Sequence, residues 1–195
     1  MIGMKHILLI NGNPDPSPDK LTSALARAYR EGAEDDECVV REINIGDISF
    51  PWLHNASEFA SVATDKAIIE AQGAFLAADH VVFIYPLWLG AAPALLKAYM
   101  EQVARGEFLL GKGAGRFPRG RLKGRSARVI VTMGMPAILY RIMFGAHGVK
   151  AFNRSILGMA GIKPVATTLF GGSEIQPSGC ARTIETVREM GRRKK

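Results

Sequence analysis

Short apolar runs and segments with helical spacing alternate along the whole chain. Runs typical of buried strands lie at 5–10, 38–45, 80–85, 127–132 and 165–170. Between them, the recurrence of apolar residues predicts helices at 17–32, 64–78, 93–103, 146–159 and from 178 onward. Ser17 is a suitable N-cap for the first helix, and Pro18 suits its first position. The pattern therefore predicts an α/β chain.

Strands that alternate with helices form parallel sheets with both faces covered. Right-handed crossovers leave few arrangements, and we expect a three-layer, doubly wound, five-stranded parallel sheet in the order 2-1-3-4-5. The stretch 105–125 is the one linker-like region, but the last strand and helix are needed to complete the sheet. We therefore expect one domain over residues 1–195.

Composition narrows the setting of the protein. Hydrophobic residues make up 48% of the chain, which is enough for a substantial core. No apolar run reaches the roughly 18–20 residues of a membrane span. The N-terminal segment lacks a small-residue cleavage site, and we interpret it as the first strand rather than a signal peptide. Cys38 and Cys180 lie far apart, so we expect reduced thiols and a cytoplasmic protein.

The first strand-to-helix turn, 11–23, has the residue types of a phosphate site. Gly12 allows a sharp turn, prolines stiffen the loop, and a helix N-terminus offers unpaired amides. The predicted binding residues are Asn13, Ser17, Leu21 and Thr22. Asp15 and Asp19 count against a phosphate site unless their carboxylates face solvent, and a plain capped turn is the alternative. The turn lacks GxGxxG and the P-loop lysine, which disfavours a Rossmann or P-loop site.

The turns after the third and fourth strands suit a planar ring. The first is apolar and contains a tryptophan, and the second contains Gly134, which permits close backbone approach. The predicted ring-binding residues are Pro86, Leu87, Trp88, Leu89, Gly90, Thr132, Met133, Gly134 and Met135. A hydrophobic corner in the core is the alternative for 86–90. Ligands of such sheets bind at the carboxyl ends of strands, where all three turns meet.

The three turns suit a phosphate, a planar ring and a close backbone contact with that ring. Together, on a flavodoxin-like sheet, they fit flavin mononucleotide (FMN). NGNP…LTSALA, YPLWLGAAPALLKAYMEQV and TMGMP resemble the flavin loops of the flavodoxin-like NAD(P)H:quinone reductases, and the similarity extends through 141–172. The resemblance implies a homodimer with flavin at the subunit interface. It also implies ping-pong hydride transfer from NAD(P)H through FMN to a quinone or similar acceptor. The chain departs from the family in its Pro- and Asp-rich first loop and in having Met135 where a second glycine is common.

The same resemblance implies that Tyr140 and His147 lie over the ring as catalytic residues. There they would donate hydrogen bonds to the acceptor oxygen, while the amides of Gly134 and Met135 would stabilise the reduced ring. From the residues alone, Tyr140 also fits a core aromatic, and His147 fits a helix cap. The remaining His and Cys residues lack the spacing of a metal site, so no metal is expected.

Several alternatives remain open at this stage. FAD is possible in place of FMN, the nicotinamide and the acceptor are unspecified, and an azo or nitro reductase would share the fold. A flavodoxin-type electron carrier and a flavin-free nucleic-acid-binding module are rival classes.

The net charge of +7 is concentrated in the connection 105–125 and in the tail 192–195. The connection fits a solvated loop, a site for the phosphates of NAD(P)H, or an acidic partner, and the tail is expected to be solvated. No nucleic-acid motif is present, so no nucleic-acid partner is expected.

Overall fold

The computed structural model describes residues 4–35, 37–111 and 120–194. Within them, one parallel sheet has the order β2-β1-β3-β4-β5. Its strands are β1 (Lys5–Asn11), β2 (Cys38–Asn44), β3 (His80–Pro86), β4 (Ser126–Met133) and β5 (Val165–Gly171). The predicted strand order is confirmed.

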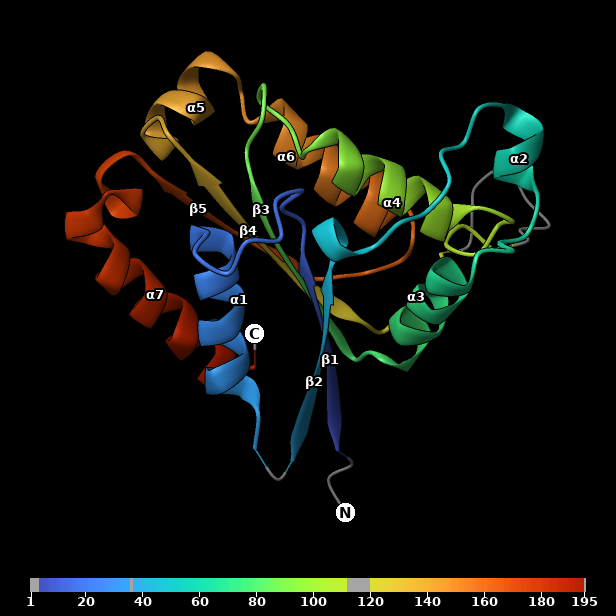
Figure 1. The fold of residues 1–195 in the computed structure, drawn as a ribbon, viewed down its shortest axis with the longest axis horizontal. Helices are drawn as coiled ribbons and strands as arrows, with labels where there is room; N and C mark the ends of the chain where they lie inside the picture. Colours follow the sequence, from blue (N-terminus) through green and yellow to red (C-terminus); the bar gives the residue numbers. More distant parts are fainter. Residues whose placement is uncertain (1–3, 36, 112–119, 195) are drawn as a thin grey trace.

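Helices cover both faces of this sheet (Figure 1). The α-helices are α1 (Leu21–Ala33), α2 (Ala56–Ala60), α3 (Lys66–Ala77), α4 (Ala94–Ala104), α5 (Ala137–Met143), α6 (His147–Ala151) and α7 (Pro177–Arg192). The 3-10 turns η1 (Ile45–Asp47) and η3 (Gly172–Ile175) and the π-helix η2 (Phe152–Gly158) complete the elements. Helices α1 and α7 lie on one side of the sheet, and α3, α4 and α6 lie on the other (Figure 1). None of the described helices is long and apolar enough to cross a membrane.

The central strand β3 is buried from His80 to Tyr85, so its side chains enter cores on both faces. On the α3–α4 face, the ring of Phe83 packs edge-on against Phe152, with centroids 5.1 Å apart. On the α1–α7 face, Ile84 belongs to the same cluster as Leu25. Such burial explains why the strand has a continuous apolar sequence rather than an alternating one.

Helices α1 and α7 approach closely because glycines stand at their contact. A methyl group at Gly191 would lie 2.2 Å from the carbonyl oxygen of Tyr29, and one at Gly32 would lie 2.1 Å from that of Arg188. No side chain fits at these distances. The two glycines therefore hold the last helix against the first.

The predicted start of the first helix at Ser17 is wrong. Helix α1 begins at Leu21, and its N-cap Lys20 makes no side-chain capping bond. The amide of Ser17 donates to Oδ1 of Asp15 at 3.0 Å, and its carbonyl accepts from the amide of Lys20 at 3.2 Å. These local bonds compete with helix formation and keep the loop open for one further turn.

The predicted helix at 146–159 is also different in detail. Helix α6 ends at Ala151 and continues as the π-helix η2, and the short helices α2 and α5 were not expected. Gly145 and Ala146 have left-handed backbones, with φ of 56° and 52°, and these separate α5 from α6. The remaining helices lie within three residues of their predicted bounds.

The basic connection contributes structural bonds where it is described. Arg105 is buried and donates to the Ser61 carbonyl at 3.1 Å, while Arg125 donates to the Ala78 carbonyl at 2.8 Å. Residues 112–119, which include three of its basic residues, lie outside the described residues. Residues 120–125 lead into the amino end of β4, at the end of the sheet opposite the three predicted turns.

The C-terminal tail is solvated at Arg192 and Arg193, as expected, since both are exposed, whereas Lys194 is half-buried. Arg192 and Arg193 form ion pairs with Glu189, and Lys194 pairs with Asp35. Helix α7 ends at Arg192, and the pair between Lys194 and Asp35 joins the tail to the segment that follows α1.

Candidate functional site

The site is a cluster of three loops at the carboxyl ends of β1, β3 and β4. They span 12–20, 87–93 and 134–136. Because β1 pairs with β3 and β3 pairs with β4, the three loops are neighbours at one end of the sheet. The topology thus brings together the three segments that the sequence singled out.

The first loop is built from three successive Asx turns. The amide of Asn13 donates to Oδ1 of Asn11 at 3.3 Å, and the amide of Asp15 donates to Oδ1 of Asn13 at 3.1 Å. The amide of Ser17 then donates to Oδ1 of Asp15 at 3.0 Å. Each side chain therefore replaces a backbone acceptor, and the loop takes a defined shape without regular secondary structure.

Further bonds attach this loop to α1. Nδ2 of Asn13 donates to Oγ1 of Thr22 at 2.9 Å, and Oγ of Ser23 donates to the Ser17 carbonyl at 3.1 Å. Lys20 pairs with Asp15 at 2.9 Å, and this hydrogen bond is the main reason that the pKa of Asp15 falls to about 2. Thr22 is buried, so it supports the loop from beneath.

The N-terminus of α1 is open for an anion. The amides of Leu21, Thr22 and Ser23 have no acceptor among the described residues, and no side chain caps them. First-turn amides and the positive end of the helix dipole favour a phosphate group at this position. The 13-residue helix is long enough for that dipole to develop.

The second loop forms a tight turn over 88–91. Trp88 and Ala91 exchange backbone hydrogen bonds of 3.0 Å, and both central residues have positive φ, 47° at Leu89 and 79° at Gly90. Pro86 and Leu87 are half-buried beneath the turn. Trp88 is 51% exposed, and Leu89 is 107% exposed. The amides of Leu89 and Gly90 have no acceptor among the described residues.

The third loop is joined to the second through the backbone. The Leu87 amide donates to the Thr132 carbonyl at 2.7 Å, and the side chains of Thr132 and Met133 are buried. Gly134 and Met135 are exposed, and their amides have no acceptor within the described part of the chain. Gly134 and Met135, rather than Thr132 and Met133, thus have free amides at the surface of this loop.

The two predicted catalytic residues lie close in sequence but differ in environment. Tyr140 is buried on α5, and its hydroxyl donates to the Gly90 carbonyl at 2.8 Å. Burial raises the pKa of this hydroxyl. His147 is exposed at the start of α6, with its ring against Gly145. The structure thus joins Tyr140 to the second loop and places the His147 ring beside Gly145.

Sequence reasoning missed the apolar surface of α5. Its exposed large side chains are Ile138 (61%), Leu139 (44%), Ile142 (72%) and Met143 (68%), and Phe144 follows at 46%. We call these five residues, together with the exposed Trp88 and Leu89 of the loop that Tyr140 contacts, the apolar rim. A run of apolar residues with no polar face was the available signal.

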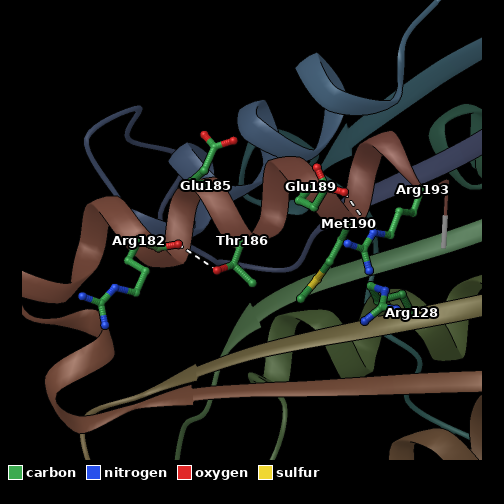
Figure 2. Close-up of a pocket in the computed structure, with 7 residues that line it drawn as sticks. All are labelled: Arg128, Arg182, Glu185, Thr186, Glu189, Met190 and Arg193. Carbon is green, nitrogen blue, oxygen red and sulfur yellow. Dashed lines mark hydrogen bonds and ion pairs between the residues drawn. The ribbon is translucent and has the colours of Figure 1, made fainter.

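A separate groove lies between α7 and β4 and encloses about 600 Å³ (Figure 2). It is lined by Arg128, Arg182, Glu185, Thr186, Glu189, Met190 and Arg193. Its carboxylates are already paired with arginines of α7. None of its residues belongs to the three loops, so the groove is distinct from the candidate site.

The other histidines and tryptophan lie away from the loops or in structural positions. His80 is buried at the amino end of β3, with Nδ1 2.7 Å from Oγ of Ser126. Burial, followed by the charges of Lys5 and Arg128, lowers the pKa of His80 to about 4. Trp52 and His54 are exposed in the loop before α2. The described residues contain no cluster of His, Cys, Asp or Glu that could hold a metal ion.

Known proteins share this architecture over nearly the whole chain. A family model described as a flavodoxin-like fold matches residues 5–191. The solved structure of an NAD(P)H:quinone oxidoreductase from Methanothermobacter marburgensis superposes with a TM-score of 0.78 at 20% identity, covering 99% of this chain and 100% of that chain. This likeness concerns the fold.

Two sequence relatives extend the comparison. FMN-dependent NADH:quinone oxidoreductase 2 of Listeria innocua is 26% identical in an alignment of 209 positions. This alignment covers 96% of each protein. A ribosyldihydronicotinamide dehydrogenase-like protein of Penicillium crustosum is 28% identical in an alignment of 154 positions. This alignment covers 66% of this chain and 57% of that protein. The first of these alignments extends over nearly the whole length of both proteins.

Proposed function

The chain belongs to the family with the flavodoxin-like fold, and on that basis we propose that it is an FMN-dependent NAD(P)H oxidoreductase that reduces a quinone or similar small acceptor. The observation that carries the proposal is the convergence of unpaired amides from three loops at one end of the sheet. The relative from Listeria innocua, named as an FMN-dependent NADH:quinone oxidoreductase, supports the same activity.

The loops fit FMN by the chemistry of their donors. The phosphate would lie at the amides of 21–23, and the isoalloxazine ring would lie against Trp88 and Leu89 with the amides of 89–90 and 134–135 at its edges. When bound, FMN supplies hydride transfer, accepting two electrons and a proton from NAD(P)H and delivering them to the acceptor, which takes one more proton from solvent or a side chain.

The protein's own groups bind, orient and stabilise charge. The amides of Gly134 and Met135 are proposed to face the ring edge that becomes negative on reduction, where preorganised donors are most effective. His147 is proposed to donate a hydrogen bond to the acceptor, since its ring is exposed. Tyr140 is proposed to act through the second loop, because its buried hydroxyl donates its proton to the Gly90 carbonyl rather than to the acceptor.

A homodimer is proposed because the apolar rim is too large for an ordinary monomer surface. Three neighbouring residues of α5, Ile138, Ile142 and Met143, are each more than 60% exposed. Contiguous patches of this kind mark interaction sites. Ile142→Glu should convert the dimer to a monomer in sedimentation analysis, whereas Ile69→Glu, on the exposed face of α3, should not. Dimers in both variants would place the interface elsewhere.

A cytoplasmic location is proposed from the cysteines. Cys38 is buried, Cys180 is half-buried, and both are free thiols. Unpaired thiols are typical of reducing compartments.

The test is cofactor binding followed by activity. The purified protein should bind FMN with a flavin absorbance spectrum, and mixing with NADH or NADPH should bleach that spectrum before a quinone restores it. A protein that binds FMN but is not reduced by either nicotinamide would instead be an electron carrier. Failure to bind FMN or FAD after reconstitution would refute the proposal.

A further inference from the structure

The turn at 88–91 is held in place by a segment fifty residues further along the chain. The Tyr140 hydroxyl donates to the Gly90 carbonyl at 2.8 Å. Gly148 closes on the same group, because a methyl group there would lie 2.1 Å from the Gly90 oxygen and 2.7 Å from Cα of Ala91. Tyr140 and Gly148, which lie on either side of His147 in the sequence, therefore both lie against the Gly90 carbonyl.

The turn has little else to fix it. The Leu89 side chain is fully exposed, and Gly90 has no side chain, so neither central residue packs against the fold. Both also have positive φ, which an L residue such as Leu89 rarely adopts. Within the turn, only the backbone pair between Trp88 and Ala91 opposes rearrangement. The hydrogen bond from Tyr140 to Gly90 therefore contributes much of the stability of this turn conformation.

Tyr140 is well placed to provide that bond. It is the one buried residue of α5, with a fully buried side chain, and its ring packs near Phe144 with centroids 6.1 Å apart. A buried ring offers few rotamers, so its hydroxyl stays aimed at Gly90. The other residues of α5 are exposed, apart from the half-buried Ala137 at its start.

We infer that Tyr140 is a positioning residue whose hydrogen bond to the Gly90 carbonyl fixes the 88–91 turn before the cofactor binds. Because Gly148 has no side chain, it leaves room for this contact, which we call the lock. The lock keeps the unpaired amides of Leu89 and Gly90 in one orientation, and this deepens the proposed function because those amides are the proposed ring donors. Preorganised donors bind a ligand more tightly because less ordering is required on binding.

The experiment uses Trp88 as a reporter in the apoprotein. In a Trp52→Phe background, Trp88 is the sole tryptophan. Tyr140→Phe should increase acrylamide quenching of Trp88 and speed amide exchange at Ala91 about 3- to 10-fold, as expected for loss of one ordinary hydrogen bond. FMN should bind about 3- to 10-fold more weakly for the same reason. Tyr99→Phe is the matched control, since the Tyr99 hydroxyl is buried without a partner.

Gly148→Ala provides an independent second variant. Its methyl group should displace the turn and give the same changes at Trp88 and Ala91, whereas Gly73→Ala, with nothing within 4 Å, should not. Equal quenching and exchange in Tyr140→Phe and Tyr99→Phe would overturn the inference, as would an unmoved turn in Gly148→Ala. A loosened turn in a protein that binds no flavin would support the lock while refuting the proposed function.

Discussion

Leu89 is an exposed leucine with a left-handed backbone. We expect that replacing it makes the apoprotein more stable but weakens FMN binding. Its side chain is 107% exposed, so Leu89→Gly removes no buried apolar area. Its φ of 47° costs a non-glycine residue about 1–2 kcal/mol. Glycine relieves this cost but adds about 0.5–1 kcal/mol of backbone entropy in the unfolded chain. The difference predicts that the apo protomer becomes more stable by about 0.5–1 kcal/mol.

FMN binding should change in the opposite direction. If Leu89 covers one face of the ring, removing about half of a leucine's burial energy costs about 1 kcal/mol, or a roughly fivefold weaker Kd. Urea unfolding of the apoprotein followed by circular dichroism, and FMN titration by fluorescence, measure the two effects. Leu89→Asn is the companion variant, because asparagine tolerates the left-handed region without glycine's entropy.

The refuting result is a loss of stability. Destabilisation of the apoprotein by more than about 1 kcal/mol at every protein concentration would show that Leu89 packs within its own fold. Destabilisation that diminishes as the protein concentration rises would instead show that Leu89 packs against a second copy.

Three further predictions concern the scaffold. Gly191→Ala should destabilise the protein by about 2 kcal/mol or more in urea unfolding, since its methyl group would meet the Tyr29 carbonyl, whereas Gly73→Ala should be neutral or stabilising. The pKa of His80 is near 6.5 in the unfolded chain but about 4 in the folded protein. The free energy of unfolding should therefore fall by up to about 3 kcal/mol as the pH drops from about 6.5 to about 4. His80→Gln should remove most of this pH dependence. Asn13→Ala removes two loop hydrogen bonds of a buried side chain, so calorimetry should show FMN binding about 10-fold weaker together with a lower unfolding midpoint.

Much of the sheet could be predicted because its strands are buried on both faces. The run His80–Tyr85 is a continuous apolar segment apart from its first residue, and its order in the sheet followed from right-handed crossovers. The start of α1 was harder, because the side chain of Asp15 captures the amide of Ser17 and delays the helix. Helix α5 was missed because its exposed apolar residues carry no amphipathic pattern.

The location of the candidate site followed from topology, but its internal contacts did not. Parallel pairing alone brings the three loops to one end of the sheet. The bond from Tyr140 to Gly90 joins residues fifty positions apart, and no local pattern in the sequence indicates such a contact. The positive φ of Leu89 was also unreadable, because leucine gives no sign of a left-handed backbone.

The three Asx turns of the first loop have a consequence for how this protein can change over evolutionary time. The loop's shape is set by its own side chains, and its outer residues Pro16, Pro18 and Asp19 are exposed rather than part of the core. The Gly12 amide is anchored separately to the Ile84 carbonyl at 2.7 Å. The exposed positions of 14–19 can therefore change without repacking the core, provided that Gly46 leaves room for the Pro14 carbonyl. Selection can in this way alter the surroundings of the proposed phosphate site while the amides of 21–23 stay in place.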